Sequence, residues 1–360
     1  MTLLHRYMVR QNLFLLLLVL VAGTAIYLLT DIIERMDVFL DAGLGFKEIL
    51  LYCLLKTPTI ISQILPAVFL LAMVLQLNIL DRSRELIALR AGGLSPLVLA
   101  RFVLVYGLFW AVAQLFFSQA AGAAGEQAAS RMWQEQVRGN DLSQKTISGL
   151  WFTEGARVIH IDTAYPNQGK GLGLLIYRLD DQGLGIEEIV RAESFTIEKD
   201  DWRLQNAMYI LPGSFSSERR PEMTLPLKQD LKAFGTVEAM NRPTEMPLWE
   251  LSALISRLKK SGSNVEGLRT AWHGKLAYAA SIVAMGLVAL VISQVTGNIY
   301  KAMGLSLLGA FLFYSLNTWC SALGSKGIVP PMVGGWLGVL LPTGACLFVL
   351  FLPNLRRSFR

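Results

Sequence analysis

The sequence contains little charge for its length. Asp, Glu, Lys and Arg make up 17% of its 360 residues, whereas hydrophobic residues make up 53%. A soluble globular domain carries about 25% charged residues. The composition therefore excludes an ordinary soluble protein and indicates a chain that crosses a membrane several times. The formal net charge is +6. Many of the basic residues flank apolar runs, so we expect no nucleic-acid partner.

Cysteine and histidine are also scarce, with three of each. All three cysteines lie inside apolar runs, at Cys53, Cys320 and Cys346. They predict buried thiols rather than a disulfide framework. The histidines are far apart in the chain, at His5, His160 and His273, and no HExxH pattern is present. We therefore expect no metal site.

Motifs for nucleotide hydrolysis and acyl transfer are absent. Neither the phosphate-binding pattern GxxxxGK[ST] nor the nucleophile pattern GxSxG occurs. Alternate glycines at 169–173 lie in a strand-rich region without a following helix, so we interpret them as a loop. The chain is therefore expected to hold no cofactor and to perform no hydrolysis itself.

Long apolar runs dominate both ends of the chain. The predicted spanning helices are 12–30, 46–80 and 96–118 near the N-terminus and 273–293, 302–323 and 332–352 near the C-terminus. The second run is too long for a straight span, and Pro58 and Pro66 are its predicted bend points. No cleavage site follows the first run, so we expect no removable signal peptide.

The middle of the chain has a different pattern. The Ala-rich stretch 119–137 is predicted to be a helix leaving the membrane, and 247–261 an amphipathic helix. Between them, short alternating segments predict strands that form a sandwich or jelly roll. The predicted strands are 157–163, 173–179, 186–192, 194–198, 202–211, 223–227 and 231–237. The domain prediction is helices in 1–118, a β-jelly-roll domain with flanking helices in 119–265, and helices in 266–360.

The charged segment 81–96, DRSRELIALRAGGLSP, separates the second and third apolar runs. Its spacing predicts a short helix that Gly92 and Gly93 end, because glycine enters the left-handed conformation easily. Ser95 is the predicted N-cap of the next helix and Pro96 its first residue. An ordered loop of this kind favours a docking role. The alternative, a simple turn between two spans whose charges keep it in the cytosol, is the commoner situation.

Lysine and arginine are distributed unevenly between the two sides of the membrane. If both termini are cytosolic, ten such residues on short segments lie inside: Arg6, Arg10, Arg82, Arg84, Arg90, Arg101, Lys301, Arg356, Arg357 and Arg360. Three lie outside: Arg35, Lys47 and Lys326. By the positive-inside rule, the β domain is therefore expected outside the cytosol, in a periplasm if the cell has two membranes.

Three cations lie near the predicted outer ends of the first two helices: Arg35, Lys47 and Lys56. One hypothesis is a rim that attracts an anionic lipid headgroup where water is scarce. The other is that their side chains only extend to the membrane interface, which is at least as plausible for Arg35 and Lys47. Glu34 and Asp37 stand beside Arg35, and a rim for anions would favour cations alone.

Several segments resemble the lipopolysaccharide export permease family (LptF/LptG, YjgP/YjgQ), and the resemblance covers essentially the whole chain. The most telling are RYMVRQNLF at 6–14, QILP at 63–66 and RELIALRAGGLSP at 84–96. The segments LWFTEGARVIHI at 150–161 and LSALISRLKKSG at 251–262, with the helix that begins at 272–275, are more similar to the LptG branch.

The resemblance implies a membrane protein of six helices with an inserted periplasmic jelly-roll domain, in the inner membrane. It implies four kinds of partner: an LptF-like paralogue, two copies of an LptB-like cytosolic ATPase, an LptC-like bitopic β protein, and lipopolysaccharide as the ligand. ATP and magnesium would be bound by the ATPase. The complex would extract the lipid and pass it to a periplasmic bridge.

The resemblance also implies roles for individual residues. The coupling helix that docks on the ATPase would use Arg84, Glu85, Leu86, Leu89, Arg90 and Gly92. The first and fifth helices would line gates and interfaces. Candidate residues of the cavity or gate are Ile26, Ile33, Leu65, Phe69, Phe311 and Leu316. Two other functions stay open at this point: a scaffold or sensor that does not transport, and a lipid-modifying enzyme, for which no catalytic group is present.

Overall fold

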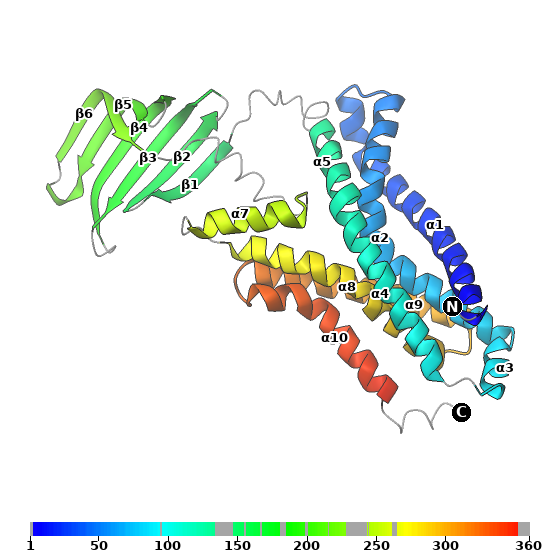
Figure 1. Ribbon diagram of the computed structural model, residues 1–360. Coiled ribbons are helices and arrows are strands. Elements are labelled where there is room, and N and C mark those ends of the chain that lie inside the picture. The colour runs from blue at the N-terminus through cyan, green and yellow to red at the C-terminus, as the bar shows by residue number, and fades with distance from the viewer. Residues whose placement is uncertain are drawn as a thin grey trace. The chain divides into compact units, whose positions relative to one another are not determined.

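The computed structural model describes residues 3–93, 96–133, 147–154, 156–165, 168–180, 185–198, 201–214, 216–227, 243, 245–260 and 265–351. The chain divides into two compact units (Figure 1). The helical unit comprises Met1–Arg131 and Pro243–Arg360, and the β unit comprises Met132–Arg242. The β unit is thus inserted between two groups of helices.

Within the described residues, six helical segments are long and apolar enough to cross a membrane. The first group contains α1 (Leu3–Asp41), α2 (Phe46–Arg82), and α4 (Pro96–Phe117) continued by a π-helical turn (Ser118–Gly122) and α5 (Ala123–Met132). The second contains α8 (Glu266–Val295), α9 (Ile299–Ser325) and α10 (Pro331–Phe351). The predicted arrangement of three helices, a β domain and three helices is confirmed.

The first helix is longer than the apolar run that predicts it. With 39 residues, α1 is about 58 Å long at 1.5 Å per residue. The hydrocarbon layer is about 30 Å thick, so α1 must tilt or extend beyond it. The charged residues that follow the apolar run, from Asp31 to Asp37, therefore belong to the same helix.

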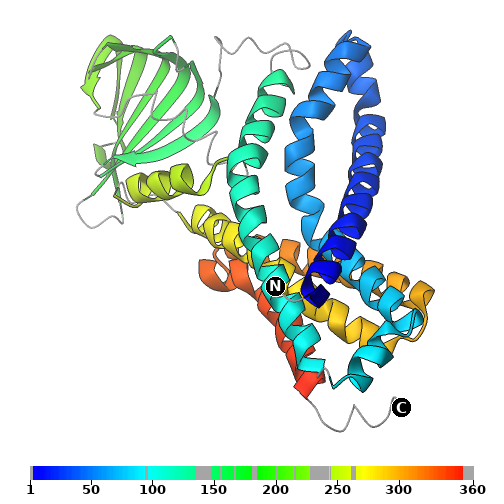
Figure 2. The same ribbon diagram turned by 45° about the vertical axis from the view of Figure 1, so that its right-hand side comes forward.

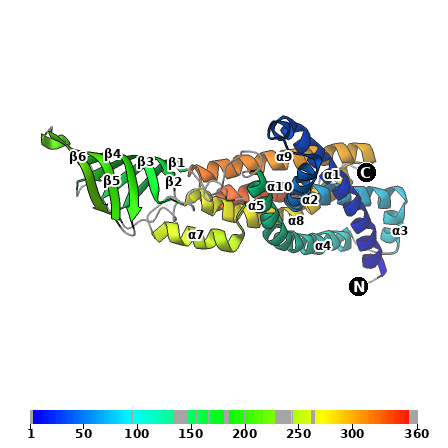
Figure 3. The ribbon, with the colours of Figure 1, turned by 90° about the horizontal axis from the view of Figure 1, so that it is seen from above.

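The centre of the helical unit is formed by α2 and α8, whereas α1 and α9 lie at its surface. In the most apolar windows, 67% of α2 and 61% of α8 are buried, against 6% of α1 and 22% of α9. Viewed from above, α8 lies between α4 and α9, and it contacts both (Figure 3). The fully buried side chains of this core include Phe69, Met73 and Ile282. In the described part of the chain, the outward faces of α1 and α9 are exposed.

Both predicted bend points lie inside α2, and the helix changes direction along its length (Figure 2). Pro66 has no N–H to donate to the carbonyl of Ser62. Instead, Gln114 Nε2 of α4 donates to that carbonyl oxygen at 3.3 Å. The next carbonyl, that of Gln63, accepts hydrogen bonds from Tyr314 Oη of α9, at 3.0 Å, and from Tyr278 Oη of α8. Neighbouring helices thus satisfy the backbone where the proline interrupts it.

The amphipathic helix predicted at 247–261 is α7 (Leu248–Lys260). It belongs to the helical unit rather than to the β unit. The backbone N–H of Leu248 donates to Gln119 Oε1 at 2.8 Å. Leu251 and Leu254 are buried, while Trp249 is 60% exposed. The polar contact and the buried leucines together fix α7 against the spanning helices.

The β unit is one antiparallel sheet in which each strand pairs with the next along the chain. Its strands are β1 (Ile147–Glu154), β2 (Arg157–Tyr165), β3 (Lys170–Leu179), β4 (Ile186–Glu198), β5 (Asp201–Leu211) and β6 (Ser216–Pro226). The predicted strands 186–192 and 194–198 are a single strand, β4, and β1 was not predicted. The predicted strand 231–237 lies outside the described residues.

A line of irregular positions crosses all six strands. At each of these positions the regular cross-strand pairing skips a residue. The residues are Gly149, Asp162, Gly173, Glu193, Asn206 and Pro221. Gly149, Gly173 and Asn206 have φ values of +67°, +67° and +52°, which β-strands do not normally contain. The inward face also changes phase at this line. In β2, for example, buried Ile159 and Ile161 are followed by buried Ala164 rather than residue 163. The line bends the sheet while keeping a single core.

The core of the β unit is centred on aromatic residues of β4 and β5. Phe195 stacks on Trp202, with ring centroids 4.9 Å apart and planes inclined by 17°. Trp202 is fully buried. Phe195 is paired across the strands with Leu204. The described strands thus form one curved sheet with one apolar face, rather than two separate facing sheets.

We expect Trp202→Ala to destabilise the β unit by about 3–5 kcal/mol, because it leaves a large cavity in this core. Amide hydrogen exchange of β4–β6, measured on the full-length chain in detergent, would report the change. Trp151→Ala is the matched control, because Trp151 is 57% exposed; its expected effect is below about 1 kcal/mol. Equal losses of protection in the two variants would contradict the prediction.

Candidate functional site

Polar groups gather at both ends of the α1–α2 pair. The two helices are antiparallel: Asn12 of α1 contacts Gln76 of α2, and Asp31 of α1 contacts Lys56 of α2. We call the end next to the connecting loop 42–45 the hairpin end, and the opposite end the α3 end. The predicted docking residues lie at the α3 end, and the predicted rim lies at the hairpin end.

The short helix predicted between the second and third spans is α3 (Glu85–Ala91). After α2 ends, the N–H of Arg84 donates to the carbonyl of Asp81 at 3.1 Å. Gly93 follows α3 with φ +85°, as expected for a residue that ends a helix in the left-handed conformation. Pro96 begins α4. The predicted N-cap, Ser95, lies outside the described residues.

Arg84 has a left-handed backbone that the sequence does not indicate. Its φ is +59°, which is uncommon for a residue with a β-carbon. The carbonyl of Arg84 nonetheless accepts the hydrogen bond from Ala88 N–H at 3.0 Å, which starts the helix. The residue thus combines an exposed charge with the turn that directs α3 away from α2.

The exposed face of α3 includes one apolar residue that sequence analysis did not name. Ile87 is 58% exposed, whereas Leu86 and Leu89 are half-buried. Gly92 is exposed and follows the helix, and the side chain of Arg90 lies outside the described residues. An exposed isoleucine beside Arg84 provides the mixture of charge and apolar area that protein contacts use.

Hydrogen bonds connect α1 to α2 and α3 at this end. Tyr7 Oη donates to Glu85 Oε1 across 3.4 Å. Deeper in the helices, Asn12 Nδ2 donates to Gln76 Oε1 at 2.9 Å, and Gln76 Nε2 donates to the carbonyl of Met8 at 2.8 Å. Asn12 and Gln76 are fully buried. This hydrogen-bonded set fixes the register of α1 on α2 at the α3 end.

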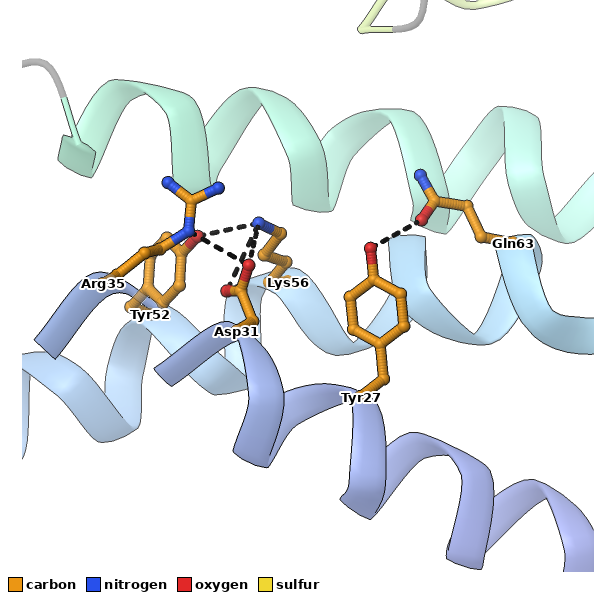
Figure 4. A network of polar contacts seen from close by, with 6 residues as sticks. All are labelled: Tyr27, Asp31, Arg35, Tyr52, Lys56 and Gln63. Carbon is orange, nitrogen blue, oxygen red and sulfur yellow. Dashed lines mark hydrogen bonds and ion pairs between the residues drawn. The ribbon is translucent and has the colours of Figure 1, made fainter. Parts of the chain in front are cut away.

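At the hairpin end, an acidic residue brings two of the predicted rim cations together (Figure 4). Arg35 Nε lies 3.0 Å from Asp31 Oδ1, and Lys56 Nζ lies 3.1 Å from the same oxygen. Lys56 Nζ also donates to Tyr52 Oη at 2.8 Å. We call Asp31, Arg35, Tyr52 and Lys56 the Asp31 cluster. Its two cations were predicted from the sequence and Asp31 was not, although the spacing of four residues between Asp31 and Arg35 indicates such a pair on a helix.

Burial makes the Asp31 cluster different from surface ion pairs. The exposed fractions of the side chains are 8% for Asp31, 14% for Lys56 and 35% for Arg35. Charges with so little access to water interact strongly, and removing one partner leaves the other poorly solvated. Lys47, the third predicted rim residue, is exposed at the start of α2, nine residues before Lys56.

The six candidate residues of the cavity or gate divide into two groups. Ile26 and Ile33 on α1 and Phe311 on α9 are exposed, at 66%, 72% and 66%, and Leu316 is half-buried. Leu65 and Phe69 of α2 are instead buried in the core of the helical unit. Only the first group is accessible to a lipid or to another protein. In the described part of the chain, no group of histidine, cysteine and acidic residues is suited to hold a metal ion.

Comparison with known proteins gives a consistent result. The model of the family described as "Lipopolysaccharide export system permease LptF/LptG" matches residues 6–352. The chain is also similar to the lipopolysaccharide export system permease protein LptG of Escherichia coli K12, with 23% identity over 342 residues. The match covers 92% of each of the two chains. LptG of Escherichia coli O6:H1 has the same identity and coverage.

We expect Lys56→Met to destabilise the helical unit because Asp31 keeps its charge but loses one of two cationic partners. Combining it with Asp31→Asn should cost less than the sum of the two single changes, by about 1 kcal/mol or more. Equilibrium unfolding in mixed detergent micelles would measure this coupling.

The matched control for the coupling measurement is Asp37→Asn combined with Lys47→Met. Asp37 and Lys47 are exposed residues on the same two helices. Their effects should add within about 0.5 kcal/mol. An additive result for Asp31 and Lys56 as well would mean that their ion pair contributes nothing measurable.

Proposed function

Because the chain belongs to the lipopolysaccharide export permease family LptF/LptG, we propose that it is one of two permease subunits of an ATP-driven exporter. The exporter extracts lipopolysaccharide from the inner membrane and passes it to a periplasmic bridge towards the outer membrane. The similarity to LptG over 92% of the chain supports the LptG-like position in the pair, next to an LptF-like paralogue.

The observation that carries this proposal is the exposed apolar surface of α1 and α9. Ile26, Ile33 and Phe311 project from the helical unit without cover from the chain's own core. A lipid with several acyl chains needs an apolar enclosure larger than the surface of one six-helix unit. A second permease that faces α1 and α9 would complete such an enclosure.

Extraction requires energy that this chain has no motif to supply. Each methylene moved from an apolar surrounding into water costs about 0.8 kcal/mol. The sequence contains no phosphate-binding loop, so we assign ATP and magnesium to two copies of a cytosolic ATPase. A bitopic LptC-like protein with its own β domain would receive the lipid beside the β unit.

The distribution of lysine and arginine supports the orientation of this complex. Ten basic residues on the short segments of one side, against three on the other, favour cytosolic termini and a periplasmic β unit. In this orientation α3 faces the ATPase. The Asp31 cluster and Lys47 then face the outer leaflet, where the lipid enters.

In this assignment α3 is the coupling helix. The exposed Ile87 of α3 and Arg84, which precedes the helix, would contact the ATPase, and the hydrogen bond from Tyr7 to Glu85 would link that contact to α1. A movement of the ATPase would thereby reach the helix whose apolar face borders the lipid. At the hairpin end, Arg35, Lys47 and Lys56 would attract the phosphate groups of the lipid.

We expect the chain, reconstituted in proteoliposomes with its paralogue, the ATPase and the bitopic protein, to transfer lipopolysaccharide to a soluble acceptor only when ATP is present. Photo-crosslinking of the lipid to the acceptor would measure the transfer. Complexes with a hydrolysis-deficient ATPase serve as the control. Transfer that does not depend on ATP, or no transfer by an assembled complex, would favour a scaffold or sensor instead.

We also expect Arg84→Ala and Glu85→Ala to weaken binding of the ATPase by about fivefold or more, the effect of losing one important interface residue. Binding of the purified ATPase to the permease pair in nanodiscs would measure it. Arg84→Gly separates charge from geometry, because glycine adopts φ +59° without strain. Ser83→Ala, in the same exposed turn, is the control. Wild-type binding by both alanine variants would contradict docking through α3.

A further inference from the structure

The carboxylate of Asp31 lies where an anionic ligand of Arg35 and Lys56 would bind. One of its oxygens is within 3.1 Å of both cationic nitrogens, and the other lies 3.4 Å from Lys56 Nζ. Phosphate oxygens form the same charge-assisted hydrogen bonds with arginine and lysine. The chain thus supplies its own anion to the two cations that a lipid phosphate would use.

This contact also holds two helices together. Asp31 and Arg35 belong to α1, whereas Lys56 and Tyr52 belong to α2 (Figure 4). The buried hydrogen bonds of Asn12 and Gln76 lie 19 residues earlier in α1, which is about 28 Å along the helix. Near the hairpin end, α1 is held on α2 by the Asp31–Lys56 ion pair, the edge contact of Phe39 with Tyr52, and the 3.5 Å hydrogen bond from Tyr27 to Gln63.

The side chains of the Asp31 cluster differ in their exposure to solvent. Arg35 is its most exposed charged member, while Asp31 is almost completely covered. An anion that approaches from the surface therefore meets Arg35 first and Lys56 afterwards. A phosphate monoester carries about −1.5 to −2 charges near neutral pH, more than the carboxylate. The two anions repel each other and cannot share the two cations at equal strength.

We propose that Asp31 is a positioning residue for transport: its carboxylate occupies the anion site until a phosphate group of the transported lipid displaces it. The displacement separates Asp31 from Lys56 and releases the part of α1 around Asp31 from α2, while loop 42–45 and the Asn12–Gln76 contact hold the two ends of the helix pair in place. Lipid entry thereby opens the exposed wall formed by α1. The proposal rests on the proposed function, because it takes the phosphorylated lipid as the ligand.

Competition between phosphate and the Asp31 carboxylate for the two cations affects the binding of both anions. If phosphate displaces Asp31, removing the charge of Asp31 must strengthen the response to phosphate by the same linkage. Asp31→Asn should therefore lower the lipid concentration for half-maximal ATPase stimulation, by about fivefold, the lower end of typical couplings. It should also raise the ATPase rate without lipid, because α1 is already released. A purely structural role for Asp31 gives the opposite result, a weaker response to lipid.

The experiment uses the complete complex in nanodiscs and titrates three probes: a bisphosphorylated lipid A, its dephosphorylated form, and inorganic phosphate. The fivefold shift in Asp31→Asn is expected with the phosphorylated lipid alone. Asp37→Asn, an exposed acid on the same helix, should titrate like the wild type. An equal shift with the dephosphorylated lipid would overturn the role of phosphate. An equal shift with inorganic phosphate would overturn the assignment to a lipid headgroup.

A second measurement does not depend on how well Asp31→Asn folds. Spin labels at Leu29→Cys and Leu54→Cys, both on exposed positions, report the separation of α1 and α2 once the three native cysteines are replaced. Without lipid, the complex that retains Asp31 should give a narrow distance distribution. Phosphorylated lipid should lengthen and broaden it, and dephosphorylated lipid should not. An unchanged distance in a complex that still transfers lipid would overturn the role of Asp31 and leave the proposed function standing. A complex that binds lipid and shows the distance change, yet transfers no lipid, would overturn the proposed function and leave the role of Asp31 standing.

Discussion

Water is absent from the hydrocarbon layer, so every backbone group that α2 leaves unpaired must find a partner on another helix. This constraint determines how the helical unit is assembled. Pro66 interrupts α2 near its middle, and the carbonyls of Ser62 and Gln63 accept hydrogen bonds from α4, α8 and α9. Three helices from two distant parts of the sequence thus converge on one turn. The interruption in α2 costs little because the same contacts fix the positions of its neighbours.

The first helix stands outside this arrangement. None of the hydrogen bonds to the backbone carbonyls of Ser62 and Gln63 comes from α1, and only 6% of the residues in its most apolar window are buried. Its polar contacts with α2 are concentrated at Asn12–Gln76 and in the Asp31 cluster. The helical unit therefore contains a connected group, α2, α4, α8, α9 and α10, and a peripheral helix, α1, which packs mainly on α2. A helix attached in this way can move on one side without disturbing the core.

Much of this fold could be predicted from the sequence, and the failures have physical causes. Six apolar runs indicated the spans because a hydrophobic length requirement acts locally on the chain. The predicted strands ended or began beside Asp162, Gly173 and Glu193, all of which lie on the irregular line across the sheet. Alternation changes phase there, so β4 was divided in two. Continuity of β4 depends on pairing with β3 and β5, which no local pattern records.

Some residues of the candidate site could be predicted from the sequence and others could not. Helix α3 follows from its glycines, its charges and its position between two spans. The left-handed Arg84 leaves no pattern in the sequence, because asparagine or glycine would be the usual residue there. Lys56 drew attention as a cation within an apolar run. Its partner could not be identified in the same way, because Asp31 is 25 residues away in the sequence. Asp31 is also only one of several charged residues that follow the first apolar run.

Stability alone does not account for the Asp31 cluster. A buried ion pair often contributes no more than a pair of well-packed apolar residues, because the cost of removing two charges from water offsets their attraction. An ion pair does, however, make the contact between the two helices sensitive to a third charge. A contact between apolar residues does not respond in this way. An anion of higher charge can replace the carboxylate and change what holds α1. Within the cluster one carboxylate contacts two cations, so an incoming phosphate can replace it without leaving either cation unpaired. A rim without Asp31 would bind phosphate more tightly, but it would not couple that binding to the separation of the two helices.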